Sequence, residues 1–109
     1  MAYVLVLEDD PEQLVTRQLL LEIAGHRVSS VSTAEEACLH AEAADVLVMD
    51  LVPGYDEVLS RLPASTPVIV LSGRQGIGES VSARAACVLL KPCSSKILIE
   101  TIARLAAWT

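Results

Sequence analysis

The stretch VLVMDLVPG, residues 46–54, decides the fold that we expect for this chain. Its first four residues are apolar, as in a strand that is buried on both faces of a parallel sheet. The run ends in a carboxylate, Asp50, and the following Pro53 and Gly54 are typical of a turn. Asp50 is therefore either a chemical residue at the end of a buried strand or only the first residue of a turn.

Four other stretches have the length and composition of strands, and segments of helical character separate them. This alternation predicts an α/β protein with a parallel sheet. We predict a single-domain (βα)5 fold over residues 1–109, with a flavodoxin-like, doubly wound sheet of five strands in the order 2-1-3-4-5. The second strand is the most polar and is expected at an edge of the sheet. The expected strands are residues 3–7, 27–31, 46–49, 68–71 and 87–90.

The first helix is predicted to begin after Asp10, which precedes Pro11 as an N-cap precedes a proline at the first helical position. Gly25 is expected to end this helix. An apolar side chain recurs at every fourth position, and this spacing predicts the buried face of the helix. The residues on that predicted face are Val15, Leu19 and Ile23.

The next three helices are predicted from their capping residues and from the room between strands. The second helix is predicted to begin with a capping box. Ser32 and Thr33 are equally good candidates for the first residue of that box. Residues 56–62 have room for a third helix of about two turns. A loop with three glycines at residues 73–78 leads into a fourth helix. We therefore expect the third and fourth helices to be shortened.

Composition limits the classes of function. The chain has 109 residues, 52% of them hydrophobic, and a mean hydropathy of +0.49, as in a globular protein with one core. Its net charge of −6 argues against direct binding of nucleic acid, which requires clustered Lys and Arg. No apolar run is long enough to cross a membrane. Cys38, Cys87 and Cys93 lack metal-binding spacing and are expected to be reduced thiols in the cytoplasm.

Polar side chains follow four of the five expected strands. They are Glu8 and Asp9 after the first, Asp50 after the third, Ser72 after the fourth and Lys91 after the fifth. The carboxyl ends of these strands meet if the strand order is 2-1-3-4-5. Because clustered carboxylates repel one another, a cation should neutralise them, and two or three carboxylates with several waters suit Mg²⁺. Lys91 and Ser72 remain to bind an anion such as a phosphoryl group.

Four motifs in this order, VLVLEDDP, LVMDL, VIVLSG and LLKP, make the whole chain resemble the response-regulator receiver domains of two-component signalling. The resemblance implies that Asp50 accepts a phosphoryl group from a phosphohistidine of a sensor histidine kinase or a phosphotransfer protein. It also implies that Glu8, Asp9 and Asp50 bind Mg²⁺. Ser72 would hydrogen-bond the phosphoryl oxygens, and Lys91 would pair with them. Such a domain then binds an unidentified downstream protein or passes the phosphate on in a phosphorelay.

The chain departs from this family in the loop after Asp50. Pro53 follows Asp50 by three residues, one fewer than is usual in the family. The backbone carbonyl two residues after the acceptor also binds the metal in the family, and Val52 has that position by count. The shortened loop leaves open whether the Val52 carbonyl reaches a metal. Val88 stands where the family commonly has a switching Tyr or Phe, so signalling through an aromatic rotamer is not expected.

Three functions compete. The first is a stand-alone phosphoacceptor domain without an output domain, which signals through a partner protein and is not an enzyme beyond its own phosphorylation and dephosphorylation. The second is a degenerate receiver that keeps the acidic pocket as a protein-interaction module and is not phosphorylated. The third is a Mg²⁺-dependent phosphohydrolase. The third is disfavoured because such enzymes carry a second Asp two residues after the nucleophile, where this chain has Val52.

Overall fold

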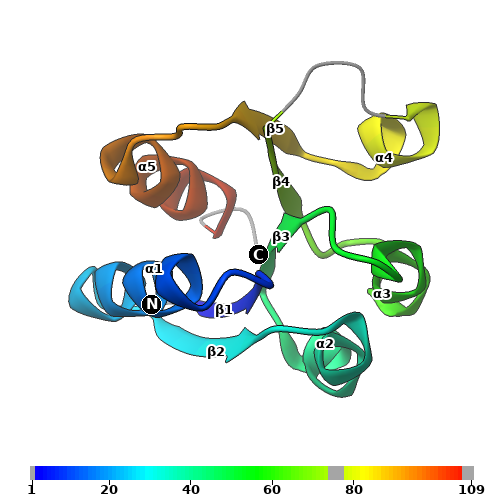
Figure 1. Ribbon diagram of the computed structural model, residues 1–109, viewed down its shortest axis with the longest axis horizontal. Coiled ribbons are helices and arrows are strands. Elements are labelled where there is room, and N and C mark those ends of the chain that lie inside the picture. Colours follow the sequence, from blue (N-terminus) through cyan, green and yellow to red (C-terminus); the bar gives the residue numbers. More distant parts are fainter. Residues whose placement is uncertain (1, 74–77, 107–109) are drawn as a thin grey trace.

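A five-stranded parallel sheet between two layers of helices forms the centre of the molecule (Figure 1). The computed structural model describes residues 2–73 and 78–106. The strand order is β2-β1-β3-β4-β5, so the predicted fold class and strand order are confirmed, and the polar second strand lies at an edge. The strands are β1 (Tyr3–Leu7), β2 (Arg27–Val31), β3 (Val46–Asp50), β4 (Val68–Ser72) and β5 (Cys87–Leu90).

Helices cover both faces of the sheet. The helices α1 (Pro11–Ile23) and α5 (Ser95–Ala106) lie on one face, and α2 (Ala34–His40), α3 (Tyr55–Arg61) and α4 (Glu79–Arg84) lie on the other (Figure 1). A 3₁₀ segment, η1 (Ala41–Ala43), follows α2. The helices α3 and α4 have seven and six residues and are short, as predicted. Residues 74–77 of the predicted glycine loop lie outside the described residues. Within the described residues, no helix is long and apolar enough to cross a membrane.

Two aliphatic cores, one on each face, hold the helices against the sheet. Side chains along a strand point alternately to opposite faces, so β1 and β3 contribute to both cores. Glu8 and Asp50 follow the even-numbered positions of β1 and β3, whose side chains face α1 and α5. The alternation therefore directs the side chains of Glu8 and Asp50 toward these two helices. The residues of β1 and β3 on the side of α1 and α5 are Val4, Val6, Val46 and Val48, and those on the opposite side are Leu5, Leu7, Leu47 and Met49.

The predicted buried face of α1 is wrong. The side chains of Val15, Leu19 and Ile23 are 56%, 55% and 82% exposed. The helix instead turns Leu14 and Leu21 toward the sheet, where they join the core on the side of α1 and α5. The prediction failed because α1 is apolar on more than one side, so helical spacing alone allowed two faces. Contact with the sheet then selected the face that contains Leu21, which is completely buried.

The predicted start and end of α1 and the predicted start of α2 are confirmed. One carboxylate oxygen of Asp10 accepts hydrogen bonds from the N–H groups of residues 12 and 13 at the start of α1. Gly25, directly after the cap of α1, has a φ of +98°, a backbone conformation that favours glycine. Of the two residues that could begin the second helix, the structure uses Thr33, whose hydroxyl oxygen accepts from the N–H of Glu36 at 3.2 Å.

Gly54 connects the loop after β3 to α3 and brings that loop close to α2. Its φ is +85°, in the left-handed region that side chains other than glycine rarely adopt. A Cβ atom added at Gly54 would lie 3.1 Å from the Cβ of Ala34, the first residue of α2. Glycine is therefore required here both by the backbone conformation and by the neighbouring helix.

Gly54→Ala is expected to lower the free energy of unfolding by about 1–2 kcal/mol, because the new side chain is strained at positive φ and crowds Ala34. Urea denaturation of the two proteins measures this difference. Gly25→Ala is the matched control, since Gly25 also has a positive φ but no atom lies within 4 Å of its added Cβ. The loss should be smaller for the control, and equal losses would show that crowding at Ala34 contributes nothing.

Candidate functional site

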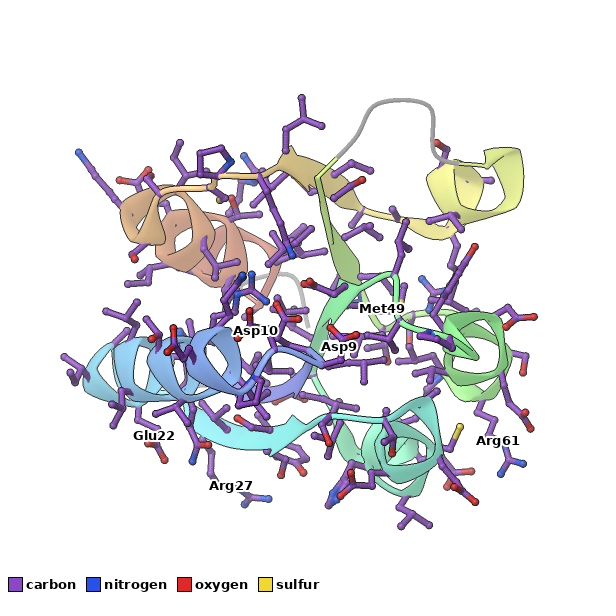
Figure 2. All side chains as sticks on the ribbon, viewed as in Figure 1. Asp9, Asp10, Glu22, Arg27, Met49 and Arg61 are labelled. Atoms are coloured by element: carbon purple, nitrogen blue, oxygen red, sulfur yellow. The ribbon has the colours of Figure 1, made fainter. Side chains whose placement is uncertain are left out.

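The carboxyl ends of four strands bring the predicted site residues to one edge of the sheet. The register pairs Leu7 with Met49, so Glu8 and Asp50 lie at the same level on neighbouring strands. Ser72 pairs with Leu90, which places Lys91 directly beyond the end of β4. Figure 2 shows Asp9 near the centre of the view, beside the ends of the central strands. The predicted convergence of strand ends is therefore present.

A small cavity of about 180 Å³ lies at this edge. Its wall includes five of the six residues that the sequence singled out, and Glu8 is the one that does not line it. Asp50 is only 7% exposed, although it is ionisable and ends a strand. Buried carboxylates require charged or hydrogen-bonding partners, so the contacts of Asp50 decide what this cavity can bind. The five residues are Asp9, Asp50, Val52, Ser72 and Lys91.

Two basic side chains neutralise Glu8 and Asp50. Nη1 of Arg17 donates to Oε1 of Glu8 at 2.6 Å and to Oδ1 of Asp50 at 3.0 Å. Nζ of Lys91 donates to Oδ2 of Asp50 and lies 3.7 Å from Oε1 of Glu8. The four groups form a cluster with two negative and two positive charges. The cation that the carboxylates were expected to need is therefore supplied, in this structure, by two side chains.

Glu8 is the most buried member of this cluster, with 1% of its surface exposed. Its Oε1 accepts from Arg17, and its Oε2 accepts from the backbone N–H of Asp10 at 3.1 Å. Both carboxylate oxygens thus already have donors. That Glu8 binds a metal stays a prediction, and its observed hydrogen bonds are with Arg17 and the backbone of Asp10.

Sequence reasoning missed Arg17, although a signal for it existed. Leu14, Arg17 and Leu21 are spaced by three and four residues and share the buried side of α1. A guanidinium on an apolar helix face requires an acidic partner, and the acidic strand ends nearby were already known from the sequence. The signal was lost because the face of Val15 and Leu19 was predicted to be buried instead.

Val52 lines the cavity, and the shortened loop gives its backbone a defined set of contacts. Its N–H donates to the carbonyl of Asp50 at 2.9 Å, and its own carbonyl accepts from the N–H of Tyr55 at 3.1 Å. These hydrogen bonds close the turn that leads into α3. A carbonyl oxygen has a second lone pair, so Val52 keeps one acceptor position beyond this turn.

Two carboxylates at the cavity provide oxygen ligands that suit a hard cation. Asp9 is exposed at the rim, without a side-chain partner among residues 2–73 and 78–106, and Asp50 lies in the wall. Over the same described residues, no group of three Asp, Glu, His or Cys side chains is arranged to hold a metal ion. Mg²⁺ commonly binds proteins through one or two carboxylates and keeps several waters. A site built on Asp9 and Asp50 meets that requirement.

Cys93 lies close to this cluster, in a groove of about 590 Å³ between α1 and α5 that Arg17 and Lys91 also line. Burial raises the pKa of the Cys93 thiol, and this effect outweighs the opposite influence of the Arg17 charge. Because the thiolate is the reactive form, the raised pKa argues against a nucleophilic role for Cys93. Cys38, Cys87 and Cys93 are free thiols, as the sequence predicted.

The chain resembles part of a curated bacterial regulator. Over 96% of its length it is 33% identical to the sensory/regulatory protein RpfC of Xanthomonas campestris pv. campestris, in two strains. The chain spans about 16% of the length of that relative. No protein-family model matches the chain.

Several solved structures of bacterial signalling proteins have the same architecture. The receiver domain of the Francisella response regulator 1452 superposes with a TM-score of 0.85 and 24% identity, covering 99% of this chain and 98% of that one. The chemotaxis protein CheY4 of Vibrio cholerae has a TM-score of 0.81 and 25% identity, covering 96% and 98%. The receiver domain of the sensor histidine kinase PA1611 of Pseudomonas aeruginosa PAO1 has a TM-score of 0.81 and 22% identity, covering 97% and 98%. That structure contains a magnesium ion coordinated in the active site cleft.

Proposed function

Because this chain belongs to the receiver domains of two-component signalling, we propose that it accepts a phosphoryl group on Asp50 from a phosphohistidine. The donor would be a sensor histidine kinase or a phosphotransfer protein. One observation carries the proposal: Asp50 is a buried carboxylate that lines a small cavity together with Ser72 and Lys91. A carboxylate without a chemical role is seldom placed in this way, because its burial is costly.

The proposed reaction is an in-line phosphoryl transfer. A carboxylate oxygen of Asp50 attacks the phosphorus atom, and an O–P bond forms while the N–P bond of the phosphohistidine breaks. The electron pair of that bond leaves with the imidazole, which takes up a proton. The product is an acyl phosphate on Asp50.

In this proposal, Lys91 and Ser72 contact the phosphoryl group during its transfer. The ammonium of Lys91 already contacts Asp50 and would stabilise the charge on the phosphoryl oxygens. Ser72 is buried at the end of β4, in the wall of the same cavity, and its hydroxyl would donate to a phosphoryl oxygen. The added charge on Asp50 would then change the hydrogen bonds of the surrounding loops and expose a different surface to a partner protein.

Mg²⁺ is proposed as the cofactor, held by Asp9 and Asp50. The second lone pair of the Val52 carbonyl is a further candidate ligand, because Val52 lines the cavity. The ion would supply positive charge for the phosphoryl oxygens during transfer.

A second candidate function is an interaction module that is never phosphorylated. Two observations favour it. Arg17 already neutralises Asp50 and Glu8, and the Val52 carbonyl already accepts a hydrogen bond from Tyr55. A pocket whose charges are balanced from within the chain is stable without phosphate or metal.

Incubation with acetyl phosphate and Mg²⁺, and separately with phosphoramidate and Mg²⁺, distinguishes the two functions. We expect intact-protein mass spectrometry to detect one added phosphoryl group, which is absent from Asp50→Ala. A mass increase that persists in Asp50→Ala would place the phosphate elsewhere and contradict the proposal. No increase with either donor would favour the interaction module.

A further inference from the structure

We propose that Arg17 is an internal counter-cation that competes with a divalent metal ion for Asp50, so that removing Arg17 tightens metal binding. This inference rests on the proposed metal-dependent function of the same cavity. It concerns a residue of α1 that lies outside the set of strand-end residues singled out from the sequence.

The geometry of Arg17 supports this role. One nitrogen, Nη1, donates to both Glu8 and Asp50, at 2.6 and 3.0 Å, and so bridges the ends of β1 and β3. The second nitrogen, Nη2, donates to Oε1 of Gln13, one helical turn earlier on α1, at 2.7 Å. Only 12% of the Arg17 side chain is exposed. A guanidinium with three acceptors and little exposure is held in a defined position.

The contacts of Asp50 explain why a metal and Arg17 compete. Both oxygens of Asp50 already accept from a positive group, Oδ1 from Arg17 and Oδ2 from Lys91. A metal ion that binds Asp50 must share an oxygen with one of these cations or displace it. Sharing places a divalent charge within a few ångströms of a buried guanidinium, where like charges repel strongly.

The structure provides a place for the displaced side chain. Arg17 also lines the groove of about 590 Å³ between α1 and α5, together with Thr16 and Leu20. A rotation of the Arg17 side chain toward this groove would free Oδ1 of Asp50 while α1 keeps its position. Glu12, which lines the same groove, would offer a new acidic partner.

Titration with Mg²⁺ alone, followed by the NMR shifts of the amides of residues 8–10 and 50–52, measures the affinity without any phosphoryl donor. We compare the wild-type protein with Arg17→Ala and with the double variant Glu8→Gln/Arg17→Ala. The double variant removes one negative and one positive charge, so the net charge of the pocket equals that of the wild type. It also leaves no unpaired buried carboxylate at position 8, which protects folding if the single variant is unstable.

Both variants are expected to bind Mg²⁺ about tenfold more tightly than the wild type, a change that corresponds to about 1.4 kcal/mol. The matched control is Arg61→Ala, which removes the same charge from the outer surface of α3, where Figure 2 shows Arg61 pointing away from the sheet. This control should bind Mg²⁺ as the wild type does.

Two results would overturn the competition. One is an unchanged affinity in Arg17→Ala, including the case in which none of the proteins binds Mg²⁺. The other is tighter binding in Arg17→Ala together with wild-type affinity in the double variant, because net charge alone would then explain the gain. Whether the protein is phosphorylated is tested in a separate experiment, by its mass after incubation with acetyl phosphate. The two proposals can therefore fail independently.

Discussion

Replacing Arg17 with alanine is expected to lower the free energy of unfolding by about 3 kcal/mol, because the change leaves a buried carboxylate without its closest cation. Glu8 is 1% exposed, and its Oε1 accepts from the Arg17 guanidinium at 2.6 Å, so the alanine variant removes the charged donor of this buried oxygen. Lys91 is farther away, with Nζ at 3.7 Å, and compensates only in part. Urea denaturation, followed by far-UV circular dichroism, measures the loss.

Adding Glu8→Gln to Arg17→Ala should restore most of this stability. The neutral amide no longer requires a cation, and its oxygen can still accept from the N–H of Asp10. A double-mutant cycle of the two single variants and the double variant isolates the coupling between Glu8 and Arg17. Equal losses in Arg17→Ala and in the double variant would contradict the pairing and would indicate that Arg17 stabilises the fold through packing alone.

Lys91→Met is expected to slow phosphoryl uptake from acetyl phosphate about a hundredfold, because it removes one preorganised cation from the transferring oxygens. Methionine keeps an unbranched side chain of similar length, so the variant tests the charge more than the volume. Lys91 contacts Asp50 directly, and Arg17 keeps its own contact with that carboxylate after the substitution. The rate of the mass increase at saturating Mg²⁺ is the measurement.

Lys96→Met is the matched control for this experiment. Lys96 lies on α5, its side chain is 84% exposed, and its Nζ lies 4.0 Å from Oε1 of Glu100, one helical turn away. Its removal changes the net charge of the protein by the same amount without touching the cavity. If Lys91→Met and Lys96→Met are phosphorylated at the same rate, Lys91 does not stabilise the transferring group.

Much of the fold was predictable because the signals for it are local. Apolar runs of four or five residues, separated by capped helical segments, specify an alternating α/β chain, and β3 and β4 are indeed buried along their whole length. The short α3 and α4 followed from the number of residues between strands. Caps such as Asp10 and the turn at Gly54 act within a few residues, so the sequence alone identifies them.

The orientation of α1 was not predictable in the same way. Leucine, valine and isoleucine occur around most of this helix, and hydrophobic spacing is therefore consistent with more than one buried side. The sheet decided between them by burying Leu21 and leaving Val15 and Ile23 exposed. The same decision turned Arg17 inward, toward Glu8 and Asp50.

By itself, the sequence determined the order of the strands along the chain and the polar residues at the ends of four of them, including Asp50 and Lys91. It could do so because strand length, turn residues and the two-residue alternation of side chains are properties of adjacent positions. Only the tertiary structure decided which cation neutralises Asp50. That choice depends on the rotation of α1 about its own axis, which places Arg17 within 3.0 Å of a carboxylate 33 residues away.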